Sequence, residues 1–178
     1  MRLEIRKKQA QNTIFENNRK LKLVVPCQNE KDKDELIYKE FMAYKFFEEL
    51  SDIHLKTQAV SLKIIELKNG KEIEHNMFAF LVEDDNKVAD RHAIKKYPSR
   101  RMSPLAVKDS SAINFTLFSY MIGNTDWSLA YQHNTEMFFD GRRMIAIPYD
   151  FDHSGLVNAF YAKPNPMLKI SSVTERVY

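Results

Sequence analysis

Two Asx-Gly dipeptides constrain the fold of this chain more than any other feature of its sequence. Asn69-Gly70 lies in the middle of the alternating and apolar residues 59–82, and Asp140-Gly141 lies within residues 135–148. An Asn-Gly or Asp-Gly pair flanked in this way is a strong short-range signal for a β-hairpin. The sequence therefore predicts two antiparallel hairpins, one in each half of the chain.

The first half also contains a predicted strand and a predicted helix. Residues 20–25 (KLKLVV) alternate, so Leu21 and Leu23 fall on one face of the strand and Lys20 and Lys22 on the other. Residues 35–50 (ELIYKEFMAYKFFEEL) have helical periodicity, with Asp34 as the expected cap. One side of this helix would carry Leu36, Glu40, Ala43 and Phe47.

The second half is expected to contain two further helices. A short acidic connection leads into the first of them within residues 83–97 (EDDNKVADRHAIKKY). The second covers residues 110–122, and Gly123 is a natural stop for it. We expect its buried side to consist of four residues, namely Ile113, Leu117, Tyr120 and Met121.

Composition limits the class of protein. The chain has 178 residues, of which 44% are hydrophobic and 29% charged, which fits one globular domain or one two-lobed unit. A net charge of +3 is too small to indicate a nucleic-acid partner. The single cysteine, Cys27, excludes an internal disulfide and a cysteine-based zinc site.

The first residues of the chain and the lengths of its apolar runs give an expectation for its cellular location. The charged start MRLEIRKKQAQ has no apolar core and does not read as a signal peptide, and no apolar run reaches membrane-spanning length. We therefore expect a cytoplasmic chain without a membrane partner. Residues 161–178 end in a segment that could be helical, and we expect further chain beyond it.

A group of polar residues surrounds the second hairpin. Because a tight hairpin brings its two ends together, Asn134 before it and Asp150 after it should emerge side by side, with Asp126 on the loop that leads in. An amide oxygen and a carboxylate are hard ligands suited to Mg²⁺ or Mn²⁺, and a second carboxylate can accept a proton from a hydroxyl. Phosphoryl transfer needs both. The simpler interpretation is that Asp150 and Asp152 end a strand and form a turn.

Glu40 suggests a partner in the first half. A carboxylate within an apolar stripe is costly unless a cation meets it, and breaking a buried pair costs about 3–5 kcal/mol. Lys20 or Lys22 on the preceding strand could form that pair and direct its ammonium group at the phosphates of a nucleotide. Because both lysines fall on the same face of the predicted strand, the sequence does not decide which of them pairs with Glu40.

Several motifs together resemble a known kinase family. The runs YMIGNTDWSLAYQHN (residues 120–134) and IPYDFDHSG (residues 147–155) are similar to the catalytic half of the CotH-like kinases, the spore-coat protein kinase family. More loosely, they resemble HipA-type kinases. The runs KLKLVVPC, YKEFMAYKFFEEL and FAFLVEDD resemble the amino lobe and hinge of that family, so the resemblance covers nearly the whole chain.

This resemblance implies an α+β, atypical protein-kinase-like fold with two lobes. Residues 1–83 would form a short amino lobe of antiparallel strands and one helix, and residues 84–178 a mainly helical carboxyl lobe. The implied function is metal-dependent phosphoryl or nucleotidyl transfer from ATP to a hydroxyl, with a Ser or Thr of a protein as the expected acceptor. The implied cofactors are ATP and Mg²⁺ or Mn²⁺.

The resemblance also implies a role for each site residue. Asp126 would be the catalytic aspartate, and Lys22 with Glu40 the pair that reaches the phosphates. The remaining implied residues are the metal ligands Asn134, Asp150 and Asp152, and Glu83 near the adenine-side hinge.

Two other classes of function remain open. The chain has four glycines, none clustered and none before Lys22, which favours a kinase-shaped binding module without turnover. A metal-dependent phosphohydrolase could use a set of acidic and histidine residues, namely Asp126, Asp150, Asp152 and His153. Asn134 follows Asp126 by eight positions, so the loop between them is expected to bulge.

Overall fold

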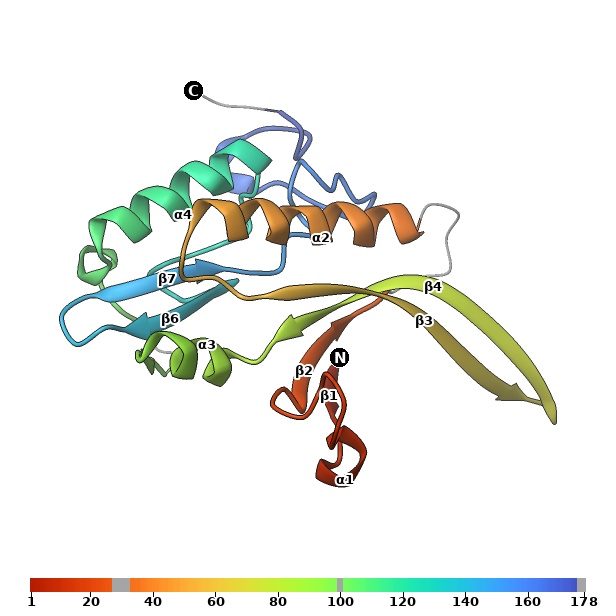
Figure 1. The fold of residues 1–178 in the computed structure, drawn as a ribbon. Coiled ribbons are helices and arrows are strands. Elements are labelled where there is room, and N and C mark those ends of the chain that lie inside the picture. Colours follow the sequence, from red (N-terminus) through yellow and green to blue (C-terminus); the bar gives the residue numbers. More distant parts are fainter. Residues whose placement is uncertain (27–32, 99–100, 176–178) are drawn as a thin grey trace.

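The computed structural model of the chain describes residues 1–26, 33–98 and 101–175 (Figure 1). Over these residues the chain is an α+β fold with two antiparallel sheets and four α-helices. The expected α+β class is confirmed. Cys27 lies outside the described residues.

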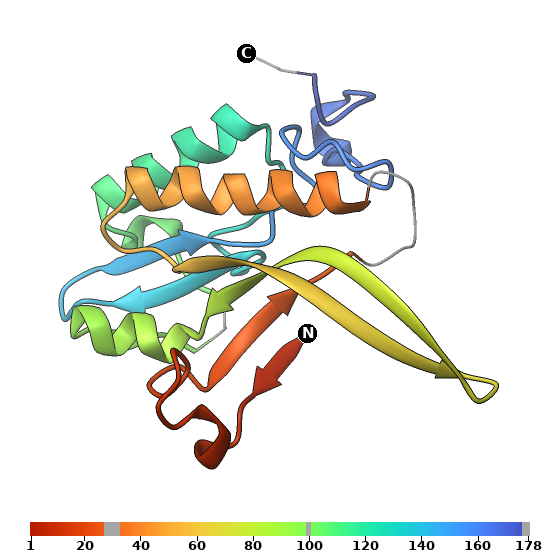
Figure 2. The ribbon, with the colours of Figure 1, turned by 45° about the vertical axis from the view of Figure 1, so that its right-hand side comes forward.

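The first sheet is four-stranded and curled, and its strand order is β1-β2-β4-β3. Its strands are β1 (Arg2–Glu4), β2 (Lys20–Val24), β3 (Thr57–Lys68) and β4 (Lys71–Glu83), and a short helix α1 (Lys7–Ala10) lies between the first two. The predicted first hairpin is confirmed, because Lys68 pairs with Lys71 and the turn residues Asn69 and Gly70 both have positive φ. The outer half of this hairpin extends away from the rest of the molecule (Figures 1 and 2).

Helix α2 (Lys33–Leu50) packs on this sheet. Its described part begins at Lys33, so Asp34 lies inside the first turn and is not the cap that the sequence suggested. Its buried side consists of Ile37, Glu40, Ala43, Tyr44 and Phe47. The predicted position of Glu40 on the buried side is therefore confirmed.

The second half of the chain mixes helices with a small sheet. Its elements are α3 (Asp85–His92), β5 (Lys95–Lys96), α4 (Asp109–Ile122), β6 (Thr135–Phe139) and β7 (Met144–Pro148), with single 3₁₀ turns at Pro104–Ala106 and Pro166–Leu168. The strands form a sheet of order β5-β6-β7, and β6 and β7 are the predicted second hairpin. Within the described residues this half is not clearly mainly helical, because after α4 it consists of a hairpin and irregular backbone.

Helix α4 forms where expected and stops at Gly123 (φ 66°), but the predicted buried side is wrong. Ile113, Leu117, Tyr120 and Met121 are all exposed. The buried side consists of Phe115, Phe118, Ser119 and Ile122. Both sides of this helix are largely apolar, so hydrophobic periodicity could not distinguish them.

One hydrophobic core is shared by both halves of the chain. Four aromatic rings link the first sheet to α4: Phe80 of β4 contacts Tyr44 of α2, Tyr44 contacts Phe151, and Phe151 contacts Phe118. Their centroid separations are 5.4, 4.8 and 5.6 Å respectively. The packing therefore crosses the expected lobe boundary at residues 83/84. No helix among the described residues combines the length and the apolar character needed to cross a membrane.

Candidate functional site

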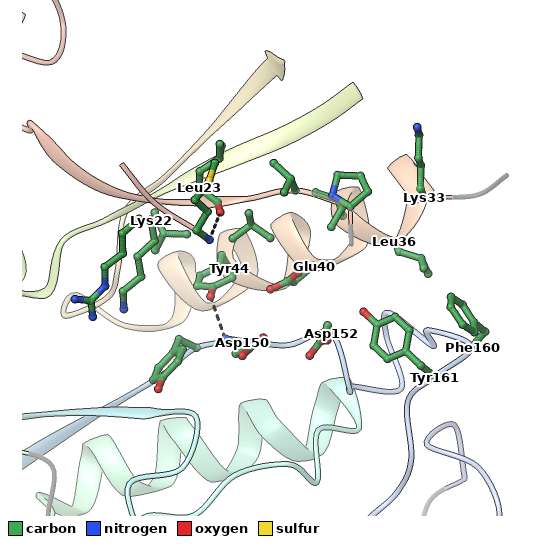
Figure 3. Close-up of a pocket in the computed structure, with 18 residues that line it drawn as sticks. Lys22, Leu23, Lys33, Leu36, Glu40, Tyr44, Asp150, Asp152, Phe160 and Tyr161 are labelled. Atoms are coloured by element: carbon green, nitrogen blue, oxygen red, sulfur yellow. Dashed lines mark hydrogen bonds between the residues drawn. The ribbon is translucent and has the colours of Figure 1, made fainter. Parts of the chain in front are cut away.

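A cavity of about 450 Å³ lies between β2, α2 and the segment that follows β7 (Figure 3). Its wall on the β2 side includes Lys22 and Val24, and α2 contributes Ile37, Glu40 and Tyr44. The segment after β7 contributes Tyr149, Asp150, Asp152, Phe160 and Tyr161. Residues far apart in the sequence thus converge on one cavity of a size typical for small ligands.

The Asp-Phe-Asp sequence after β7 divides its side chains between the core and the cavity. Phe151 is fully buried and packs between Tyr44 and Phe118. Asp150 and Asp152, on either side of it, both line the cavity. The phenylalanine therefore anchors the segment, which we call the acidic turn (residues 150–152), while its two carboxylates face the cavity.

Glu40 faces the same two carboxylates from α2 (Figure 3). Only 4% of Glu40 is exposed. Burial raises the pKa of Glu40 to about 8, and the charges of Asp150 and Asp152 contribute further to this rise. Burial also raises the pKa of Asp150 to about 6, with the charge of Asp152 as the next cause and that of Asp126 as a smaller one.

Carboxylates that raise one another's pKa in a cavity create a negative potential that a cation would neutralise. As the side chains stand, no group of three or more His, Cys, Asp or Glu residues in the described part of the chain is placed to hold a metal ion. The side chains would have to turn toward a common point to coordinate one. The oxygen donors present suit Mg²⁺ or Mn²⁺ better than softer metals.

The backbones of Asn134 and Asp150 are adjacent at the end of the hairpin, as predicted, but only Asp150 lines the cavity. Thr135 pairs with Pro148 in the β6–β7 register, and the next residue, Tyr149, donates its backbone N–H to the carbonyl oxygen of Asn134 at 3.2 Å. Asn134 and Asp150 both have left-handed backbone conformations, with φ of 48° and 63°. Non-glycine residues in this region are uncommon, although Asn and Asp tolerate it best.

Asp126 lies beside this pair and is held in place by two neighbours. The Asn134 side-chain amide donates hydrogen bonds to the backbone oxygen of Asp126 at 2.8 Å and to its carboxylate at 3.1 Å. The Nε2 atom of His133 lies 2.9 Å from the other carboxylate oxygen of Asp126. Asp126 and Asn134 do not line the cavity, although Asp126 is near enough for its charge to raise the pKa of Asp150.

Lys22 lines the cavity, as does Lys33 at the start of α2, but the expected ion pair between Lys22 and Glu40 is wrong. The Lys22 ammonium lies 3.1 Å from Asp85 and 3.3 Å from Glu136 and sits 5.0 Å above the ring of Tyr149. Lys96 contacts the same two carboxylates. These four charged residues, Lys22, Asp85, Lys96 and Glu136, form what we call the ion cluster.

Lys20 and Glu83 are not brought to the cavity. Lys20 is exposed and does not line the cavity. The Glu83 carboxylate accepts hydrogen bonds from Arg91 at 2.8 Å and from the backbone N–H of Lys56 at 3.1 Å. Glu83 therefore connects β4 to α3 and to the residue before β3, and its neighbour Val82 contributes to the cavity wall instead.

Sequence reasoning missed Tyr44, which contacts the acidic turn directly. Its hydroxyl accepts a hydrogen bond from the backbone N–H of Asp150 at 3.0 Å. The sequence did indicate that Tyr44 lies near the site, because Tyr44 follows Glu40 by four positions and so shares its face of the helix. No spacing in the sequence indicated that Lys22 would contact Asp85 and Glu136.

Comparisons of the chain with protein-family models, with curated proteins and with solved structures found no match.

Proposed function

We propose that the protein is an atypical, kinase-like phosphotransferase that moves a phosphoryl or nucleotidyl group from ATP to a hydroxyl, with a protein Ser or Thr as acceptor. The observation that carries this proposal is the convergence of a lysine, Lys22, and three carboxylates, Glu40, Asp150 and Asp152, on one cavity. A cationic group for phosphates and oxygen donors for a divalent cation are the parts that phosphoryl transfer requires. The resemblance to CotH-like kinases supports the same assignment.

In this proposal Asp150 and Asp152 hold Mg²⁺ or Mn²⁺. Asn134, the third ligand that the motif suggests, would have to release Asp126 and turn toward the cavity to join them. Burial and the charge of Asp152 raise the pKa of Asp150, and a bound cation would favour the loss of this proton. When bound, the metal would neutralise charge on the transferred phosphate. Lys22 would bind phosphate oxygens after leaving Asp85 and Glu136.

Asp126 is the proposed base, which accepts the proton of the attacking hydroxyl. His133 and Asn134 fix its carboxylate, as a base that must point in one direction requires. The two-lobed arrangement, with a boundary at residues 83/84, belongs to the same proposal.

A nucleotide-binding module without transfer is the second candidate. Two observations favour it: no glycine precedes Gly70, so no glycine-rich phosphate loop lies near β2, and Lys22 is engaged by the ion cluster.

The proposal is tested by calorimetric titration with ATP, with and without Mg²⁺, and by transfer from labelled ATP. Asp150→Ala should abolish metal-dependent binding of ATP. Asp126→Asn should leave binding intact and lower transfer by about 10²- to 10⁴-fold, the usual contribution of a general base. Glu72→Gln, an exposed carboxylate on the outer hairpin, is the matched control.

Wild-type transfer in both Asp150→Ala and Asp126→Asn would refute the assignment. Metal-dependent binding of ATP by the wild type without transfer to itself or to a protein would favour the binding module.

A further inference from the structure

A side chain of α2 accepts a hydrogen bond from the backbone of the acidic turn. The N–H of Asp150 donates to the Tyr44 hydroxyl at 3.0 Å, and Glu40, one helical turn before Tyr44, lines the cavity together with Asp150 and Asp152. Glu40 and Tyr44 are four residues apart and project from the same face of the helix. The Tyr44 hydroxyl thus holds one peptide group of the acidic turn.

The acidic turn needs such support because its backbone has left the sheet. The last hairpin-like hydrogen bond is that of Tyr149 to Asn134, and Asp150 then adopts a left-handed conformation with φ of 63°. A non-glycine residue in this conformation persists only when its surroundings determine it. Without the Tyr44 hydroxyl, the Asp150 N–H would lose its acceptor, which would add to that cost.

The Tyr44 hydroxyl is itself fixed by packing. Tyr44 is buried, and its ring lies between Phe80 and Phe151 with centroid separations of 5.4 and 4.8 Å. The ring therefore has little freedom to rotate, and its oxygen presents one acceptor position to the turn.

We infer that Tyr44 is a positioning residue for the divalent cation, because its hydroxyl fixes the backbone from which Asp150 and Asp152 project into the cavity. This inference rests on the proposed function, since it takes the acidic turn to be the cation site. Residues that orient metal ligands commonly change metal affinity by about 10- to 100-fold when they are replaced.

The test variant is Tyr44→Phe, which removes the hydroxyl and keeps the ring between Phe80 and Phe151. Tyr38→Phe is the matched control, because Tyr38 lies on the same helix and is 51% exposed. Mn²⁺ binding is measured by electron paramagnetic resonance without nucleotide, and deuterium uptake is measured for the peptide that covers residues 149–154.

We expect Tyr44→Phe to bind Mn²⁺ about 10- to 100-fold more weakly and to exchange the Asp150 amide faster, with unchanged exchange in β6 and β7. Tyr38→Phe should match the wild type in both measurements. A general loss of structure would instead accelerate exchange in the whole hairpin, and that result would overturn a positioning role.

Wild-type Mn²⁺ affinity in Tyr44→Phe would overturn the inference while leaving the proposed function intact. If the wild type binds no Mn²⁺ at all, the proposed function fails, and the role of Tyr44 in cation binding fails with it. Faster exchange at Asp150 would then show only that Tyr44 supports the turn.

Discussion

At the scale of single residues, the pairing of charges departs most from what the sequence suggested. Lys22 and Glu40 lie on neighbouring elements, yet Lys22 binds Asp85 and Glu136, and Glu40 faces other carboxylates. Asp85 belongs to α3 and Glu136 to β6, so neither contact could be foreseen from local spacing. Ion pairs between distant elements depend on tertiary packing that a pattern of residue types does not encode.

Asp85 should make stability depend on pH. Burial alone would raise its pKa, but hydrogen bonds and charges from Lys96 and Lys22 outweigh burial and hold the pKa below its ordinary value. A lowered folded-state pKa contributes stability above the unfolded pKa, and this contribution is lost as the pH falls through the folded pKa.

We therefore expect Asp85→Asn to be less stable than the wild type at neutral pH by about 2 kcal/mol. Removing one partner of a fully buried ion pair costs about 3–5 kcal/mol. The cost expected here is smaller because both lysines are partly exposed. Urea unfolding at several pH values is the measurement, and the gap between the two proteins should close below about pH 3.8, the ordinary Asp value. A gap that stays constant into acid would show that the charge of Asp85 contributes nothing.

At the scale of elements, the sequence predicted where helices and strands lie along the chain better than it predicted which face of a helix is buried. Both Asx-Gly turns, the strand at residues 20–24 and the stop at Gly123 were visible in the sequence because each depends on a few adjacent residues. The buried side of α4 was not visible. Phe118 and Leu117 are equally apolar neighbours, and only contact with α2 and β7 decides which is buried.

The two sides of α4 should respond differently to truncation. Phe118 is 1% exposed and packs 5.1 Å from Phe47, so Phe118→Ala should cost about 3–5 kcal/mol. Leu117 is 63% exposed, so Leu117→Ala should change stability by no more than about 0.5 kcal/mol. Chemical denaturation of both variants checks this, and similar costs would mean that the outer side of α4 is also covered in solution.

At the scale of the whole molecule, the outer half of the β3–β4 hairpin is separable from the body that carries the cavity. Four of its large apolar side chains are exposed, namely Ile64, Ile65, Leu67 and Ile73. A two-stranded ribbon without a covering layer adds little stability of its own.

Replacing residues 63–76 by Asn-Gly would join Leu62 to its cross-strand partner Met77 through a two-residue turn. We expect this shortened protein to keep the thermal midpoint and the Mn²⁺ affinity of the wild type. Circular dichroism and the resonance assay measure the two. A large fall in the midpoint would show that the outer ribbon is packed against something in solution.

The row of rings from Phe80 through Tyr44 and Phe151 to Phe118 has a consequence for cooperativity. Because these contacts bridge residues on both sides of position 83, neither half retains a complete interior when the other comes apart. Heating should therefore give a single calorimetric transition whose van't Hoff and measured enthalpies agree. The same rings reach the acidic turn, so the carboxylates would lose their arrangement in that one event and not in an earlier, separate step.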